Sequence, residues 1–280
     1  MLGSDRLFWH HSNGTALIDT ATGAVTELAV KPVKYPSVVV GSADGARVLV
    51  CDAAGWAQVV TFGASKPQTK RLRVSAKLPL SGGGFGTESV VLRGSYPDYA
   101  LTLHDPMTLA KTGTVKAKEL TSVSPTGAVF SSGAHGTSLL VEPSKKPIAI
   151  KTKHELAPLR WTFDGSVLLA ADQETGDLLL IDGVSGAVKG QLKRSVVADE
   201  GSNDQLLPLD AKHVVLLSPE NVKHDLQTVR IVVFAVGGKK TASLEVTFNA
   251  SKKQSGLAEL VAVAPNLIVL NAETAIDVRS

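Results

Sequence analysis

Histidine side chains bind metal ions and transfer protons near neutral pH, so the seven histidines of this 280-residue chain are the first candidates for chemistry. No two of them are separated by three residues, and the chain contains no His-Glu-x-x-His motif. His10 and His11 are adjacent, and neighbouring residues of a strand point to opposite faces, so one strand cannot direct both at one ion. The sequence therefore predicts no metal site.

A glycine-rich stretch and an acidic loop are the next candidates. The stretch Gly82 to Gly86 lacks the Gly-Lys-Ser/Thr ending of a phosphate-binding loop and precedes an expected strand, so no helix N-terminus is available for phosphate. We expect its glycines to permit close backbone packing or flexibility. Asp199 and Glu200 fall in the longest insertion, which we interpret as a solvated connection rather than a calcium site. We predict no catalytic residue and no cofactor.

Composition narrows the class of protein. With 44% hydrophobic and 20% charged residues, the chain can bury a core and is not a disordered tail. Its apolar runs have the length of one strand, far short of the roughly 18 residues of a membrane-spanning helix. Residues 1–9 contain no basic segment followed by an apolar stretch, and Cys51 is the single cysteine. We expect an intracellular protein that does not enter the membrane.

The basic residues recur in clusters along the chain. The balance of 29 Lys and Arg against 26 Asp and Glu gives a net charge of +3, which is too small to predict nucleic-acid binding by itself. The strongest cluster, residues 65–73 (SKPQTKRLR), contains no aromatic residue that could stack on bases. The cations that we select as partner-binding candidates are Lys66, Lys70, Arg71, Arg73, Lys145, Lys146, Lys151 and Lys153.

Two sequence markers recur at an interval near forty residues. Residues 18–25 (IDTATGAV) reappear as 181–188 (IDGVSGAV), 163 residues later, which is four units of about 41. The tight-turn sequences 42–45 (SADG), 124–127 (SPTG) and 162–165 (TFDG) keep the same interval, and their glycines supply positive φ. The two markers agree on about seven units.

Between the markers the chain consists of short β-branched or leucine-rich runs bounded by turn-forming residues, and helical periodicity is almost absent. Several runs are apolar at consecutive positions, which is typical of strands that are covered on both faces. About four short strands per forty-residue unit predict an all-β fold, a β-propeller of four-stranded antiparallel blades. The Asp-Gly turn then joins the first strand of a blade to the second, and the Ile-Asp pair ends the third.

The units resemble WD40 repeats, and residues 160–192 also resemble the YVTN-type propeller repeat. Residues 161–165 (WTFDG) stand in place of the family's Phe-Ser-Pro-Asp-Gly turn, and residues 180–182 (LID) stand where WD40 repeats read Val-Trp-Asp. No tryptophan precedes that aspartate, and the family's Gly-His pair is missing, so the chain resembles a divergent member without the Trp/His network. The resemblance implies that His104 and His135 make internal hydrogen bonds.

We predict seven blades within a single domain, residues 1–280. The two end blades are incomplete, with three strands each, which gives 26 strands in all. The ring is either closed with seven blades, or open and completed by a strand of a partner or by sequence beyond Ser280. The predicted blades are about 6–30, 37–74, 78–118, 120–153, 156–194, 205–248 and 257–280.

This fold places most basic clusters on the outermost strand of a blade or on the connection that follows it. Two explanations stay open: lysines block edge-to-edge aggregation of outer strands, or a basic outer rim contacts RNA or acidic partners. The resemblance implies a non-catalytic WD40-like scaffold that mediates protein–protein interaction as a subunit of a larger assembly. The alternative is a YVTN/quinoprotein-like propeller that binds a small ligand or acts as a lactonase-type enzyme, which would need Glu, Asn, Asp and His side chains at the axial mouth.

Overall fold

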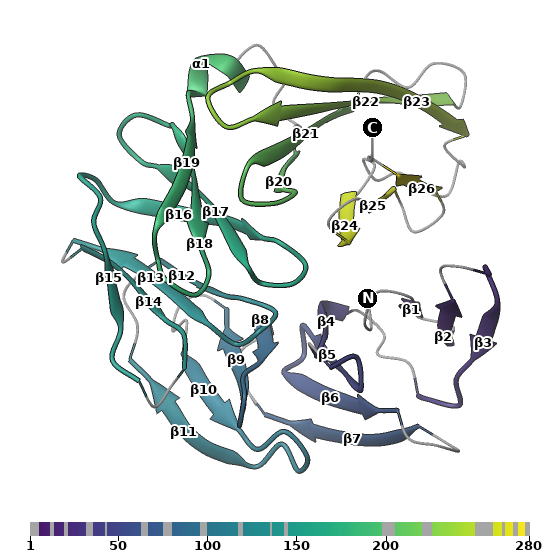
Figure 1. The fold of residues 1–280 in the computed structure, drawn as a ribbon. Coiled ribbons are helices and arrows are strands. Elements are labelled where there is room, and N and C mark those ends of the chain that lie inside the picture. Colours follow the sequence, from purple (N-terminus) through teal and green to yellow (C-terminus); the bar gives the residue numbers. More distant parts are fainter. Residues whose placement is uncertain are drawn as a thin grey trace. The chain divides into compact units, whose positions relative to one another are not determined.

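The computed structural model is all-β, as predicted (Figure 1). The part of the chain that it describes contains 26 strands and one short helix, α1 (Arg194–Val197). Two compact units, Met1–Lys151 and Thr152–Ser280, make up the chain and are described in turn. The described residues are 6–11, 14–19, 22–31, 36–42, 44–62, 67–74, 80–95, 100–116, 120–134, 136–142, 145–197, 205–219, 226–249, 260–264, 267–270 and 274–277.

The first unit contains four antiparallel sheets, each built from strands that are consecutive in sequence. The first sheet has three strands and the other three have four each. The strands are β1 (Arg6–His11), β2 (Gly14–Asp19) and β3 (Val25–Glu27); β4 (Pro36–Gly41), β5 (Arg47–Asp52), β6 (Trp56–Thr61) and β7 (Gln68–Arg73); β8 (Leu80–Phe85), β9 (Val90–Gly94), β10 (Leu101–His104) and β11 (Lys111–Val115); and β12 (Leu120–Val123), β13 (Val129–Gly133), β14 (Gly136–Leu140) and β15 (Ile148–Ile150).

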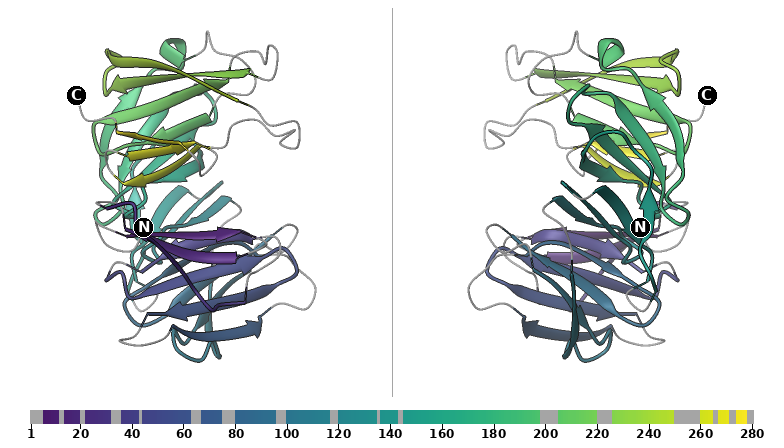
Figure 2. Two further views of the ribbon diagram at one scale, coloured as in Figure 1. Left: turned by 90° about the vertical axis from the view of Figure 1, so that its right-hand side faces the viewer. Right: turned by 90° about the vertical axis from the view of Figure 1, so that its left-hand side faces the viewer.

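The second unit contains three sheets of the same kind, and its last sheet has three strands, as predicted for an incomplete end blade. The hairpin of β22 and β23, with ten residues in each strand, is the longest described (Figure 2). The strands are β16 (Leu156–Trp161), β17 (Val167–Asp172), β18 (Leu178–Asp182) and β19 (Val188–Leu192); β20 (Gln205–Pro208), β21 (His213–Pro219), β22 (Leu226–Ala235) and β23 (Lys240–Asn249); and β24 (Leu260–Ala264), β25 (Leu267–Leu270) and β26 (Thr274–Asp277).

Within each unit, the first strand of a four-stranded sheet lies beside the first strand of the next: β4 beside β8, β8 beside β12, and β16 beside β20. Apolar side chains fill the space between successive sheets. In the first unit, Leu49 packs in one cluster with Leu80 and Leu92, and in the second unit Leu169 packs with Leu216. Because both faces of such a sheet are covered, strands such as β5 are apolar at consecutive positions, and five of its six residues are buried.

The glycine-rich stretch forms most of the first strand of its sheet, which we did not predict, and it precedes the strand β9 as expected. Gly82, Gly83 and Gly84 all lie within β8. A Cβ atom on Gly83 would lie 2.9 Å from Cδ2 of Leu49, and a Cβ atom on Gly84 would overlap the carbonyl oxygen of Ser124. Strand β8 therefore packs with bare backbone against the sheets on both sides, which is the close packing that we expected of these glycines.

The two repeat markers form the turns that we predicted. Gly45, Gly127 and Gly165 lie between the first and second strands of their sheets, with φ of 67°, 79° and 70°. Asp182 ends the third strand of its sheet, as predicted for the Ile-Asp pair. Local turn chemistry thus separates the strands at regular intervals.

Aspartate side chains hold the turns that follow them. Asp182 Oδ1 accepts hydrogen bonds from the backbone N–H of Val184 (3.1 Å) and Ser185 (2.7 Å) and from the Ser185 hydroxyl (2.8 Å). Asp105 makes the equivalent contacts after β10. A further copy that we did not predict begins at Asp172, in the turn between β17 and β18.

The turn at Asp105 departs from the others at one residue. Leu109 has φ of 59°, where the turn after β18 has Gly186 with φ of 68°. The Leu109 side chain is fully buried in the same apolar cluster as Leu49. The carbonyl oxygen of Leu109 lies 2.8 Å from Nδ1 of His104, and Nε2 of that ring lies 2.9 Å from the Thr102 hydroxyl. His104 therefore makes the internal hydrogen bonds expected of it, whereas His135 lies outside the described residues.

Candidate functional site

Strand β7, the outermost strand of its sheet, carries three of the predicted binding cations. Lys70 and Arg73 are exposed, and Arg71 is half-buried. The guanidinium carbon of Arg71 lies 4.8 Å from the centre of the Trp56 ring, and its Nη2 lies 3.7 Å from Oδ2 of Asp52. A cation over an indole face is stabilised by about 0.5–1 kcal/mol at an exposed site. The ring and the carboxylate therefore hold Arg71 against the sheet, between two exposed cations.

The other predicted cations that the structure describes lie before and after the short strand β15. Lys145 and Lys146 are exposed and precede β15, whereas Lys151 follows that strand. The expectation that basic clusters lie on the outermost strand or after it is therefore wrong for Lys145 and Lys146, which lie in the connection before it. Lys153 belongs to the second unit, and Lys66 lies outside the described residues.

The outermost strands of the sheets differ in the features that disfavour pairing of their free edges with another strand. In β11 and β19 an extra residue interrupts the pairing with the third strand, and such a bulge twists the edge away. Strand β15 is only three residues long. Strand β7 pairs with β6 in unbroken register, so its charge is the feature that distinguishes its edge.

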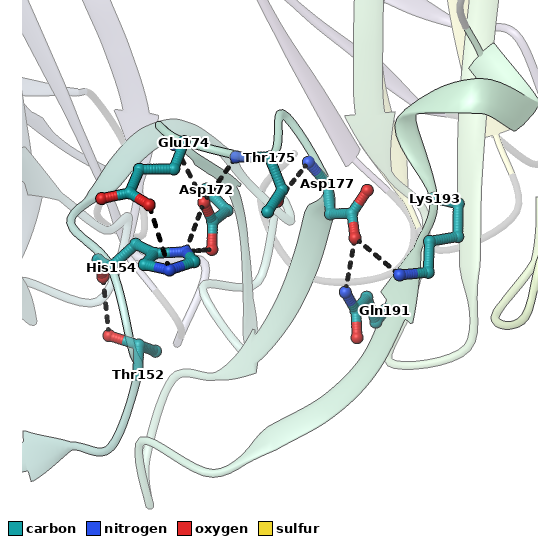
Figure 3. A network of polar contacts seen from close by, with 8 residues as sticks. All are labelled: Thr152, His154, Asp172, Glu174, Thr175, Asp177, Gln191 and Lys193. Atoms are coloured by element: carbon teal, nitrogen blue, oxygen red, sulfur yellow. Dashed lines mark hydrogen bonds and ion pairs between the residues drawn. The ribbon is translucent and has the colours of Figure 1, made fainter.

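A network of polar side chains lies at one end of the sheet β16–β19 in the second unit (Figure 3). His154 Nδ1 lies 2.8 Å from Oδ2 of Asp172, and His154 Nε2 lies 3.2 Å from Oε2 of Glu174. A neutral imidazole has one N–H, so both contacts are favourable together only when the ring carries two. Burial raises the pKa of Asp172, but hydrogen bonds from the Thr175 N–H and from His154 outweigh it and bring this pKa below its ordinary value.

The other half of the network fixes the end of β19. Asp177 Oδ1 accepts a hydrogen bond from the Arg194 backbone N–H (3.0 Å), and Oδ2 accepts from Gln191 Nε2 (2.7 Å) and Lys193 Nζ (3.1 Å). The Arg194 N–H and the Lys193 ammonium are the main causes that lower the pKa of Asp177. This carboxylate therefore ties the outermost strand of the sheet to the turn at Gly176.

The ionisable groups of these sites contact one another or are buried. Both ring nitrogens of His154 face carboxylates. Cys51 is buried, and burial raises the pKa of its thiol, which keeps it protonated near neutral pH. Within the described ranges, no group of three or more His, Cys, Asp or Glu side chains is placed to hold a metal ion, and no helix is long and apolar enough to cross a membrane.

No protein-family model and no curated protein match the chain. Solved structures match it in fold along nearly its whole length. The β-propeller domain of Cps50 (Swd1) from Myceliophteria thermophila has a TM-score of 0.57 at 11% identity, covering 95% of this chain and 92% of that one. Hsv2 from Kluyveromyces lactis has a TM-score of 0.59 at 9% identity, covering 96% and 87%.

The fold is that of a β-propeller. Its seven sheets are the blades, with three strands in the first and the last. A chain of the mitotic checkpoint complex matches with a TM-score of 0.57 at 12% identity, covering 97% of this chain and 85% of that one. The dihydro-heme d1 dehydrogenase NirN matches with 0.55 at 15%, covering 95% of this chain and 60% of that one. The resemblance to divergent WD40 and YVTN-type propellers is thus confirmed as one of fold.

Proposed function

We propose that this propeller is a non-catalytic scaffold that binds protein partners within a larger assembly, and that β7 binds an acidic segment of such a partner. One matching structure supports the first part, because it is a chain of the mitotic checkpoint complex. A fold alone does not define a function, so the second part depends on the site.

The observation that carries the proposal is the arrangement of cations on β7. Lys70 and Arg73 are exposed on either side of Arg71, which Trp56 and Asp52 hold in place. A guanidinium that is already ordered loses less side-chain entropy on binding a carboxylate. Arg71 and Arg73 point to one face of the sheet and Lys70 to the other, so an extended acidic segment along β7 can reach cations on both faces. The ordered guanidinium of Arg71 favours a specific contact over diffuse attraction.

The test compares two charge reversals of equal size. The variant K70E/R73E changes β7, and the matched control K111E/K116E changes two exposed lysines at β11. A fluorescent peptide rich in Asp and Glu is titrated into each protein near physiological ionic strength. We expect K70E/R73E to weaken binding by about tenfold or more, which is 1.4 kcal/mol or more, and the control to change it little.

Equal weakening by both variants would show that net charge, rather than β7, attracts the peptide, and would end the proposal. An RNA oligonucleotide of matched charge serves as the competing ligand. If the RNA bound at β7 more tightly than the peptide, the proposed partner of β7 would be a nucleic acid rather than a protein. The predicted cations Lys145, Lys146, Lys151 and Lys153 are tested in the same way, as separate reversals.

A small-ligand propeller is the second candidate, and the match to NirN in complex with DHE favours it. Such a function needs a ligand to stabilise the folded chain by mass action. A thermal-shift screen with haem-like and other small cofactors checks it. Stabilisation by one of these compounds, with no protein captured from native extract, would favour this candidate over the scaffold.

We also propose that residues 1–280 form one domain, and that a partner strand completes the three-stranded sheet β24–β26. A single domain should unfold in one cooperative transition that is the same by fluorescence and by circular dichroism. Two separate transitions would assign the two units to independent domains.

A further inference from the structure

Strand β23 forms the free edge of the sheet β20–β23, and within the described residues it pairs with β22 alone. The register between the two strands shifts once, between Val233 and Phe234. From Ala242 to Asn249 the pairing is regular, so most of this ten-residue strand presents a continuous edge of backbone N–H and C=O groups. Such an edge is a template for another strand.

Strand β23 has near its start the same kind of bulge as β11 and β19, but its regular pairing continues beyond the bulge over more residues than theirs does. Its pairing has no bulge after Ala242, its sequence contains no proline, and Glu245 is its only charged residue between Ala242 and Asn249. The side chains of residues 240–245 and of Thr247 are exposed. We propose that β23 binds an extended segment of another protein, which joins the sheet as an additional strand.

The register with β22 defines which segment fits. Ala242 and Leu244 lie opposite Val233 and Ile231, which are buried, and Leu244 is 48% exposed. Glu245 lies on the other face of the sheet, since successive strand residues alternate. An added strand therefore meets apolar side chains at every second position and a carboxylate on the opposite face. The segment that fits alternates apolar and polar residues and places Lys or Arg beside Glu245.

A second copy of this chain fits the edge less well. A twofold axis that pairs two copies of Ala242–Asn249 passes near the middle of that segment. This arrangement brings the two Glu245 side chains directly or diagonally opposite each other, and like charges at such positions are destabilising. A partner with its own sequence avoids this repulsion.

The experiment selects short random peptides from a displayed library against the full chain. A selected peptide is then synthesised and its affinity is measured for the wild type, for S243K/T247K, which adds cations along the edge, and for T112K/T114K, a control that adds two cations at exposed threonines of β11. We expect enriched peptides to share the alternating pattern with a basic residue. Binding should fall by about tenfold or more in S243K/T247K and stay unchanged in T112K/T114K.

Backbone methylation separates strand addition from other contacts, and it needs no variant of the protein. Methyl groups on the N–H groups of one edge of the peptide should abolish binding, whereas methyl groups on the alternate N–H groups should be tolerated. Equal binding of both methylated peptides would overturn the proposal, as would selected peptides that bind S243K/T247K as tightly as the wild type. If the wild type were dimeric and S243K/T247K monomeric, the strand that pairs with β23 would belong to a second copy of this chain instead.

Discussion

Strands β7 and β23 hold the same place in their sheets, yet they present opposite chemistry. Strand β7 has six residues and carries Lys70, Arg71 and Arg73, whereas β23 has ten residues and carries two charged residues, Lys240 and Glu245. Both edges belong to one fold, so a charged outer strand is not a requirement of that fold. The difference favours a binding role for the cations of β7 over edge protection alone, and it marks β23 as an edge that is left open.

The largest effect is expected when β7 is made as neutral as β23. In K70T/R73T the Arg71 contact to Trp56 remains, and the two exposed charges are lost. Affinity for an acidic peptide should fall by about tenfold or more, and the protein should stay monomeric by light scattering. Self-association without a loss of affinity would mean that the cations protect the edge from pairing. The cations of β7 would then have no role in binding the peptide.

The next largest effect is expected in the salt dependence of peptide affinity, which should differ between β7 and β23. Binding of an acidic peptide at β7 depends on screened charges, so it should weaken several-fold between about 0.05 and 0.3 M salt. Strand addition at β23 depends on backbone hydrogen bonds and apolar contacts, so its affinity should change much less. Titrations of both peptides across this range check the contrast, and parallel salt curves would contradict it.

Reversal of the single mid-strand charge on β23 should have a smaller effect. E245K removes the carboxylate that an added strand meets on one face, and a cross-strand charge pair contributes about 0.2–1 kcal/mol. The selected basic peptide should bind about two- to fivefold more weakly, and a peptide with Glu at that position should bind more tightly than before. Isothermal titration of both peptides shows whether the preference exchanges. If it does not, Glu245 plays no part in recognition.

The smallest effect concerns β19, a third outer strand, whose end is fixed by Asp177. Because the pKa of Asp177 is lowered in the folded chain, its carboxylate adds stability above the unfolded value of about 4, and this stability is lost as the pH falls through the lower folded value. D177N should therefore unfold at lower urea than the wild type at pH 7, with a difference that shrinks towards pH 3. E245Q, at an exposed residue, is the control. A difference independent of pH would contradict the role of the charge.

Turns were the part of the fold that the sequence predicted best, because each depends on a few adjacent residues. Gly165 and Asp182 fulfil their roles through contacts within their own turns. Strand β8 was missed because glycine disfavours strands, and the contacts that favour it here come from Leu49 and Ser124 in neighbouring sheets. The turn at Asp172 was missed for another reason: it shares Asp-x-x-Ser/Thr-Gly with the marker but lacks the preceding isoleucine.

The sequence predicted which residue types make up the candidate site, but not how they are arranged in space. The cations of β7 stand together in the sequence, so their cluster was visible. Trp56 lies on another strand and comes close only because the register pairs it with Arg73, so its ring beneath Arg71 could not be foreseen. Likewise, His154 is distant in sequence from Asp172, and only the pairing of β16 with β17 brings the two together.

The turn at Leu109 has the backbone conformation of the repeat marker without its glycine. Leu109 accepts the left-handed backbone that suits glycine, and it compensates by filling the interior beside Leu49. Reversion to glycine would relax the backbone and leave a void of several methyl groups, so the exchange is hard to undo. This turn keeps the backbone path of the equivalent turns but lacks the glycine by which they are recognised in the sequence, so the repeat is clearer in the structure than in the sequence.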